Sequence, residues 1–230
     1  MIAVSRSAWI DWGWLRANIG DLYGPVREHV VLTVLTMAAG VAIAVPLALA
    51  ARRFRPLYSA LLSVAGLLYA IPALALFALL IPYTGLSRTT ALIPLVSYTL
   101  LILLRNMVVG LDGVPPAVVE AATAMGYSPA RRLLRVELPL ALPTILAGIR
   151  LATVSTVALV TVAGLIGFHN LGNYMIIDGF QRNFRTPITV GALTTVLLAV
   201  VADRLLVGVG AVLSPWRRRT ARATETERAR

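Results

Sequence analysis

The chain has 230 residues, of which 58% are hydrophobic and only 13% are charged, and its mean hydropathy is +0.82. A soluble domain of this size needs more polar surface than this composition supplies, so the sequence indicates an integral membrane protein. The absence of cysteine excludes disulfides and thiolate metal sites, and the two histidines, His29 and His169, argue against a metal centre built on imidazoles.

The net charge of +11 comes from arginine alone, because the sequence contains no lysine. These arginines lie in short segments between apolar runs, a distribution typical of membrane-topology signals rather than of a nucleic-acid surface. A phosphate-binding P-loop needs a lysine for the β- and γ-phosphates. We therefore expect no nucleic acid, cofactor, metal or catalytic residue in this chain, and any ATP hydrolysis that drives it belongs to another subunit.

The apolar runs predict an all-α polytopic membrane protein with five transmembrane helices. A bilayer core of about 30 Å needs about 20 apolar residues in a helix. Five runs meet this requirement, at residues 30–51, 57–80, 89–111, 144–168 and 187–213. Pro72 predicts a kink in the second span.

Two terminal segments flank these spans. Residues 1–29 contain Trp9, Trp12 and Trp14, which are typical of the membrane–water interface, so we expect this segment to be extracytoplasmic and interfacial. Residues 214–230 are short and charged, and we expect them to form a cytoplasmic tail.

The arginines on the two sides of the predicted spans differ in number, which predicts the orientation. Twelve lie on one side: Arg52, Arg53, Arg55, Arg131, Arg132, Arg135, Arg217, Arg218, Arg219, Arg222, Arg228 and Arg230. Six lie on the other: Arg6, Arg16, Arg27, Arg88, Arg182 and Arg185. Because cytoplasmic loops carry the excess of positive charge, the N-terminus is predicted outside and the C-terminus inside.

Three further arginines, Arg105, Arg150 and Arg204, fall within spans near the predicted cytoplasmic ends. We expect them to extend their charged groups toward that surface or to pair between helices, with an ion relay as the alternative. Asp203 neighbours Arg204 in sequence but points elsewhere on the helix, so its partner is expected on another span.

The longest predicted cytoplasmic loop, residues 112–143, has the pattern of two short helices joined by a tight turn. Pro116 is suited to the start of the first helix, and Gly126 to the left-handed residue that ends it. Ser128 then provides an N-cap and Pro129 the first residue of a second helix. We expect Pro139 and Pro143 to end or bend that second helix.

This loop resembles the signature loop of type I ABC importer permeases, E-A-A-x-x-x-G-x(9)-[IV]-x-L-P. The matching residues are Glu120, Ala121, Ala122, Gly126, Val136, Leu138 and Pro139. Residues 69–86, 97–126 and 138–153 are similar to the branch that carries glycine betaine, choline, carnitine and related osmoprotectants. The likeness covers about residues 28–210, with departures at Tyr69 and Ala70 and at 168–170.

The resemblance implies an assembly in a bacterial plasma membrane. Two permease subunits, identical or homologous, pair in the bilayer, each seated on a cytoplasmic ABC ATPase, and an extracytoplasmic solute-binding protein delivers the solute. The loop is the coupling helix that lies in a groove of the ATPase. Its implied coupling residues are Glu120, Ala121, Ala122, Gly126, Tyr127, Ser128, Pro129 and Arg131. Glu120 is expected to fix the loop by hydrogen bonds or an arginine pair.

The substrate pathway is less defined by the sequence. Tyr69, Phe77, Tyr98 and Asn106 are candidates for lining it, with lipid contact or helix packing as the alternative for each. Other functions also stay open at this point: a permease for a different small solute such as an amino acid, a secondary transporter or channel, a membrane-embedded enzyme, and a structural anchor. A secondary transporter would leave the elbow-like loop without a purpose, and an enzyme would need clusters of reactive side chains that the spans lack. A structural anchor leaves the signature spacing unexplained.

Overall fold

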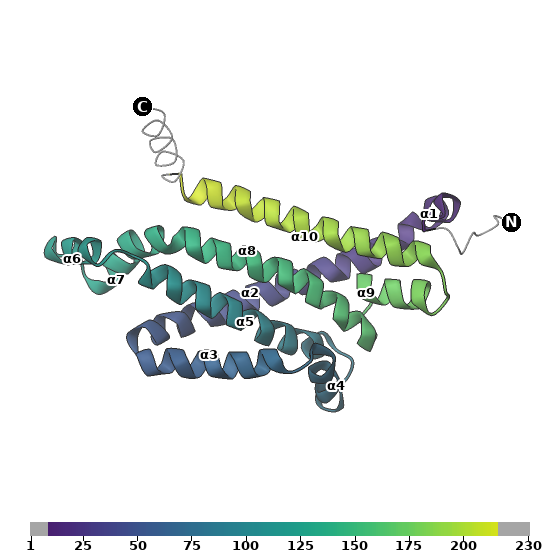
Figure 1. The fold of residues 1–230 in the computed structure, drawn as a ribbon, viewed down its shortest axis with the longest axis horizontal. Coiled ribbons are helices and arrows are strands. Elements are labelled where there is room, and N and C mark those ends of the chain that lie inside the picture. Colours follow the sequence, from purple (N-terminus) through teal and green to yellow (C-terminus); the bar gives the residue numbers. More distant parts are fainter. Residues whose placement is uncertain (1–8, 216–230) are drawn as a thin grey trace.

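The computed structural model describes residues 9–215, and every regular element in that range is helical (Figure 1). The helices are α1 (Trp12–Asn18), α2 (Tyr23–Arg53), α3 (Arg55–Ala70), α4 (Ala73–Thr84), α5 (Arg88–Asp112), α6 (Pro116–Ala124), α7 (Pro129–Arg132), α8 (Leu138–Ala163), α9 (Leu171–Tyr174) and α10 (Arg185–Leu213). Short 3-10 segments lie at Ile19–Leu22 and Gly164–Ile166, and π-helical segments at Leu133–Glu137 and Met175–Phe180. Four helical stretches are long and apolar enough to cross a membrane, and α3 with α4 makes a fifth if the bent pair is one span.

Helix α5 forms the centre of the bundle, packed between α2 and α8 (Figure 1). Its buried face carries Leu103, Leu104 and Val108, which belong to the larger hydrophobic cluster of the described residues. A small residue allows α8 to approach closely: a Cβ added to Gly148 would lie only 2.3 Å from the Cβ of Asn106 on α5. Close contacts through small residues are typical of helix packing in membranes, where lipid removes the hydrophobic drive between helices.

The second predicted span is broken rather than kinked. Helix α3 ends at Ala70, α4 begins at Ala73, and the two helices differ in direction by 92°. The cause is Pro72, which disfavours the helical conformation in the preceding residue, and Ile71 accordingly has an extended ψ of 130°. Tyr98 on α5 donates a hydrogen bond from its hydroxyl to the Ile71 carbonyl exposed at the break. One kinked helix over 57–80 is therefore corrected to two helices.

The second helix of the loop does not end at Pro139 or Pro143, because the helical path continues from Pro129 to Ile166. A bend at these prolines stays a prediction. The π-helical segment before α8 provides the reason that the helix continues. Leu138 donates its backbone N–H to the Leu133 carbonyl, one residue further back than in an α-helix. This wider turn directly precedes Pro139 in the first turn of α8, where a missing N–H is tolerated. The segment 112–143 is therefore helical for most of its length and continuous with the fourth span.

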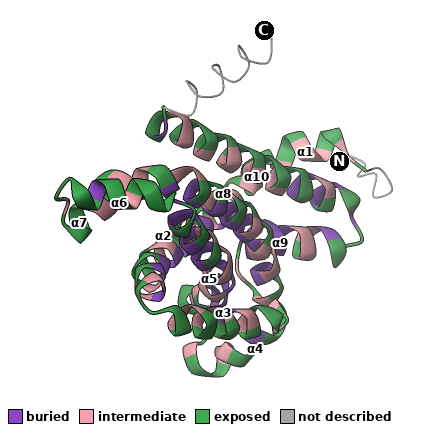
Figure 2. Cartoon of the chain, turned by 60° about the vertical axis from the view of Figure 1, so that its left-hand side comes forward, coloured by how far each residue is buried: buried purple, intermediate pink, exposed green. Residues whose placement is uncertain are grey.

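Helix α10 lies along the outside of the bundle, and Figure 2 shows its surface largely exposed. One ion pair ties it to α8: Arg150 donates from Nε and Nη2 to the two carboxylate oxygens of Asp203, at 2.8 and 3.0 Å. The prediction that Asp203 pairs with another span is confirmed, and Arg150 is its partner.

The two ends of the bundle carry different elements (Figure 1). Helices α6 and α7 lie at one end, and α1 and α9 lie at the other. Helix α2 begins at Tyr23, earlier than the predicted first span, and Trp9 and Trp12 before it are 71% and 63% exposed. Most of the predicted tail falls outside the described residues, and the orientation of the two ends across the membrane stays a prediction.

Candidate functional site

The candidate site is the elbow, which we define as residues 116–132, comprising α6, the turn after it and α7. Pro116 is the first residue of α6, and Gly126 follows its C-terminus with a φ of +79°. Tyr127 donates its backbone N–H to the Ala122 carbonyl at 3.2 Å, and Gly126 donates to the Thr123 carbonyl at 2.9 Å. This pair of bonds is a Schellman motif, so the predicted glycine stop is confirmed.

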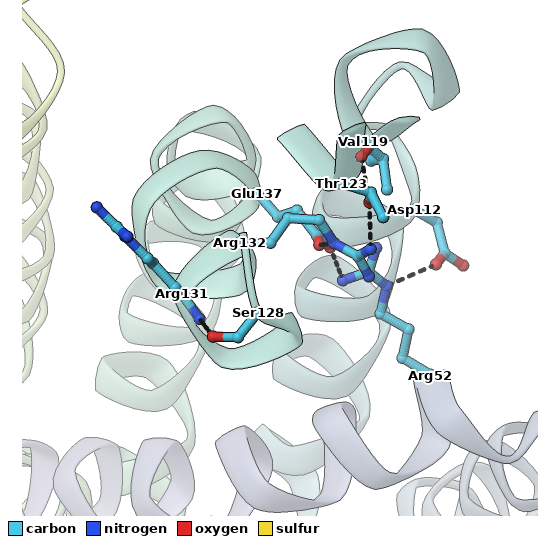
Figure 3. A network of polar contacts seen from close by, with 8 residues as sticks. All are labelled: Arg52, Asp112, Val119, Thr123, Ser128, Arg131, Arg132 and Glu137. Carbon is cyan, nitrogen blue, oxygen red and sulfur yellow. Dashed lines mark hydrogen bonds and ion pairs between the residues drawn. The ribbon is translucent and has the colours of Figure 1, made fainter. Parts of the chain in front are cut away.

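The second half of the elbow begins with the predicted cap. Ser128 accepts a hydrogen bond on its side-chain oxygen from the Arg131 backbone N–H at 3.4 Å, and Pro129 is the first residue of α7 (Figure 3). The Arg131 guanidinium lies over the Tyr127 ring at 4.7 Å from its centroid, a cation–π contact that ties the turn to α7. Each of these contacts lies within the elbow, so its shape is set by its own residues.

The elbow extends from the bundle and exposes most of its surface (Figure 2). Met125 is 69% exposed, and Ala121 and Arg131 are also exposed, whereas Ala122 is buried. Glu120 is exposed too, and among the described residues it has no hydrogen-bond or ion-pair partner. Glu120 therefore makes no contact within the described residues that would fix the loop, and its role in coupling stays a prediction. Its carboxylate faces outward because α6 turns its buried face, at Ala122, toward the bundle.

A different carboxylate, that of Glu137, holds the elbow to the bundle (Figure 3). Its side chain is only 2% exposed and accepts from Arg132 at 2.7 Å and from Arg52 at the end of α2. Arg132 also donates to the Thr123 hydroxyl on α6 at 2.8 Å. Arg52 lies 3.6 Å from the Asp112 carboxylate at the end of α5. These five residues, the Glu137 network, join the elbow to the ends of three membrane helices.

The charges of this network lie outside the hydrocarbon. About 20 residues counted back from Ala163 at the far end of α8 place the membrane edge near residue 144. Burial raises the pKa of Glu137, but the hydrogen bonds and charges of Arg132 and Arg52 outweigh burial and hold the pKa below its ordinary value of 4.5. Glu137 is therefore ionised at neutral pH, as an anchor between two guanidinium groups requires.

The sequence predicted several elbow residues near Glu137, but it did not predict the Glu137 network itself. Arg52 and Arg132 were interpreted only as topology signals, and Glu137 occupies an unspecified position of the signature. The available signal was a carboxylate among arginines, one to two helical turns before the predicted fourth span, where an unpaired charge is costly.

The four pathway candidates occupy different surroundings. Phe77 is fully buried in the smaller hydrophobic cluster, and Tyr98 is 4% exposed with its hydroxyl on the Ile71 carbonyl. Asn106 donates to the Ile102 carbonyl of its own helix at 2.8 Å and packs on Gly148. Tyr69 is 48% exposed, beside the break after α3, and its ring packs edge-on against Tyr98. Their role in transport stays a prediction.

Among residues 9–215, no group of three or more metal-binding side chains is placed to hold a metal ion. The elbow contains no nucleophile paired with a base either. The geometry is that of a stiff, exposed contact surface connected to membrane helices.

Comparison with known proteins agrees with this geometry. Residues 40–211 match the family described as "Binding-protein-dependent transport system inner membrane component". The chain is 33% identical over 202 residues to the choline transport system permease protein OpuBB of Bacillus subtilis, covering 88% of this chain and 93% of that one. It is 35% identical over 203 residues to the osmoprotectant import permease protein OsmW of Salmonella typhimurium, covering 86% and 94%.

Solved structures share the fold. An inward-facing structure of the MetNI methionine ABC transporter superposes with a TM-score of 0.75 at 21% identity, covering 84% of this chain and 95% of that one. An amino acid ABC transporter solved with histidines gives 0.72 at 19% identity, covering 87% and 98%. The chain is thus a multi-pass protein of the plasma membrane, and it belongs to the family of inner-membrane components of binding-protein-dependent transport systems.

Proposed function

We propose that this chain is the permease subunit of an ATP-driven importer for quaternary-ammonium osmoprotectants, and that its elbow is the surface that receives the motion of a separate ATPase. The observation that carries the proposal is the attachment of an exposed, internally capped elbow to the ends of α2, α5 and α8 through the Glu137 network. The ATPase is a separate protein in this family, so the permease needs a surface through which to receive force.

The physical requirement for such a surface is stiffness. A flexible loop would absorb a displacement of the ATPase, whereas a capped helix pair transmits it to the helices that it joins. The Schellman motif at Gly126 and the cap at Ser128 hold the elbow in shape. The continuous helical path from Pro129 into α8 then passes the displacement to the fourth span.

In this proposal the exposed side of the elbow lies in a groove of the ATPase on the cytoplasmic side. Met125 provides an apolar contact, while Glu120 and Arg131 provide charges of opposite sign. Glu120 has no partner among the described residues, so it is free to pair with a basic residue of the ATPase. A second permease subunit and an extracytoplasmic solute-binding protein complete the assembly.

Two glycines offer a matched test of the coupling surface. Gly126 and Gly167 both have positive φ, +79° and +92°, and neither has an atom within 4 Å of an added Cβ. Alanine therefore brings similar backbone strain at both positions, about 1–2 kcal/mol. We expect Gly126→Ala to weaken the affinity of the purified permease for the ATPase about tenfold, because the elbow must change shape. Gly167→Ala, at the opposite end, should leave the affinity within about twofold. Equal effects would contradict the proposal.

The substrate class is supported by the relatives, whose names refer to choline, glycine betaine, carnitine and osmoprotectants. We expect proteoliposomes holding the permease, its ATPase and its binding protein to take up radiolabelled glycine betaine, choline or carnitine when ATP is inside. Uptake of methionine or histidine instead would identify an amino acid permease, the second candidate suggested by the solved structures. ATP-independent uptake would contradict both.

For the pathway we propose Tyr69 as the residue that contacts solute, because its ring is exposed beside the break between α3 and α4. Phe77, Tyr98 and Asn106 would then not contact the solute; they would pack behind the pathway wall and hold it in place. Cation–π attraction between a tyrosine ring and a quaternary ammonium suits this substrate class.

A further inference from the structure

A polar pocket of about 270 Å³ lies at the end of the molecule opposite the elbow. Its lining residues are Asp21, Pro25, His169, Asn173, Tyr174 and Asp178. They come from the 3-10 segment before α2 and the first turn of α2, from the loop after α8, and from α9 with the π-helical segment that follows it. Figure 1 shows α9 and the start of α2 at this end, away from α6 and α7.

The pocket holds two carboxylates, of which one has no partner among the described residues. Asp21 is exposed and has no ion pair or hydrogen bond to another described residue. Asp178 has one partner, Arg182, at 3.2 Å on the exposed side of the same segment. The adjacent pocket shares His169, but its carboxylate is paired. Glu28 in that pocket accepts two hydrogen bonds from Arg88, at 2.9 and 2.8 Å.

Tyr174 adds an independent observation. The residue is only 5% exposed, yet its hydroxyl has no hydrogen-bond partner among the described residues. The hydroxyl of a buried tyrosine usually has a hydrogen-bond partner, so this one, which lies in the pocket lining, is available to a group that enters the pocket. Burial raises the pKa of Tyr174 to about 12, with further contributions from Asp178 and then Asp21. The hydroxyl is therefore neutral at physiological pH and lies close enough to both carboxylates to be affected by their charge.

The chemistry of these groups selects a cation that donates hydrogen bonds. Two carboxylates accept hydrogen bonds only, and the phenol oxygen of Tyr174 accepts one as well. A guanidinium or primary ammonium supplies both the positive charge and the N–H donors. A quaternary ammonium has no N–H group, so it would leave these acceptors unsatisfied.

We propose that this pocket receives an arginine or lysine side chain of the extracytoplasmic binding protein when that protein docks on the permease. The inference rests on the proposed function, since the binding protein delivers solute at the end opposite the ATPase. Charge complementarity of this kind sets the orientation and the rate of docking as well as its affinity.

The test is the affinity of the solute-loaded binding protein for the assembled transporter, with permease and ATPase, in nanodiscs. We expect Asp21→Asn to raise the Kd about tenfold, because a charged hydrogen-bonded pair is lost. Tyr174→Phe should raise it about threefold, since one neutral hydrogen bond is lost. Tyr23→Phe is the matched control: it removes a hydroxyl from a residue that is 72% exposed at the same end and outside the pocket, and the Kd should not change.

A competition assay checks the kind of cation. At equal concentration, methylammonium chloride should weaken docking more than tetramethylammonium chloride, because the two ions share one charge but only methylammonium has N–H donors. Unchanged Kd values for both Asp21→Asn and Tyr174→Phe, with normal docking by the wild type, would overturn the pocket proposal alone. Failure of the wild-type transporter to bind the binding protein would overturn the proposed function together with it.

Discussion

At the scale of single residues, two glutamates near the elbow have opposite surroundings. Glu120 is exposed and has no partner in the described part of the chain, whereas Glu137 is buried between Arg52 and Arg132. Removing a buried carboxylate from between two guanidinium partners leaves their charges unpaired, so the fold depends on Glu137. An exposed carboxylate without a partner contributes little to the fold and is free to bind another protein. Glu137 is therefore the anchor of the elbow, and we propose that Glu120 is a docking residue.

The same substitution at these two positions separates the roles. Glu137→Gln keeps the shape of the side chain but leaves the two arginines without their shared anion, so we expect a loss of about 3 kcal/mol in the free energy of unfolding. Glu120→Gln should change that free energy by less than about 0.5 kcal/mol. Thermal unfolding of the two variants in detergent, followed by circular dichroism, measures the difference. Equal stabilities would contradict the assignment.

The pH dependence of this difference has a definite sign. The pKa of Glu137 is lowered in the folded chain, so its pairs contribute fully above the ordinary value of 4.5 and are lost as the pH falls through the folded-state pKa. The stability gap between the wild type and Glu137→Gln should therefore shrink on acidification, and the gap at neutral pH should be the larger one.

Several elbow residues could be predicted from sequence because their roles are local. Gly126, Ser128 and Pro129 each act within a few residues along the chain, and capping rules apply at that range. The position of Glu137 could not be predicted in the same way. Its partner Arg132 is near in sequence, but Arg52 is brought to Glu137 by the packing of α2 against the start of α8, which no local pattern encodes.

At the scale of elements, the sequence predicted the number of apolar runs better than their shapes. Helices α5 and α10 begin and end within two residues of the spans predicted at 89–111 and 187–213. At Pro72 the helix is broken where only a kink was expected, whereas at Pro139 the helix continues where an end was expected. The effect of a proline on a helix depends on whether the preceding turn can widen, as the π-helical segment before α8 does, and that depends on tertiary contacts.

The contact between α5 and α8 gives a prediction at this scale. Gly148→Ala adds a Cβ that would lie 2.3 Å from the Cβ of Asn106, and because a Cβ moves only with its backbone, the helices must separate. We expect a loss of about 1–3 kcal/mol in the free energy of unfolding. Gly208→Ala on α10, where nothing lies within 4 Å, is the matched control and should be neutral or stabilising by up to about 1 kcal/mol. Equal effects in thermal unfolding would contradict the close packing of α5 on α8.

At the scale of the whole molecule, the two contact surfaces lie at opposite ends of the helix bundle (Figure 1). The elbow is connected through the Glu137 network to α2 and α5 and continues into α8, and the far end of α8 leads into the loop and α9 that line the polar pocket. In the proposed function, force from an ATPase at one end therefore has a helical path from Pro129 to Ile166, which ends next to the surface that we propose for the binding protein.

The side of the membrane on which the elbow lies tests the central claim most directly. The natural chain contains no cysteine, so single cysteines report without background. Met125→Cys on the elbow and Tyr23→Cys at the other end replace side chains that are 69% and 72% exposed. With a membrane-impermeant maleimide, we predict that Tyr23→Cys is labelled in spheroplasts and that Met125→Cys is labelled only in inside-out vesicles, where added ATPase protects it. Labelling of Met125→Cys in intact spheroplasts would contradict the account.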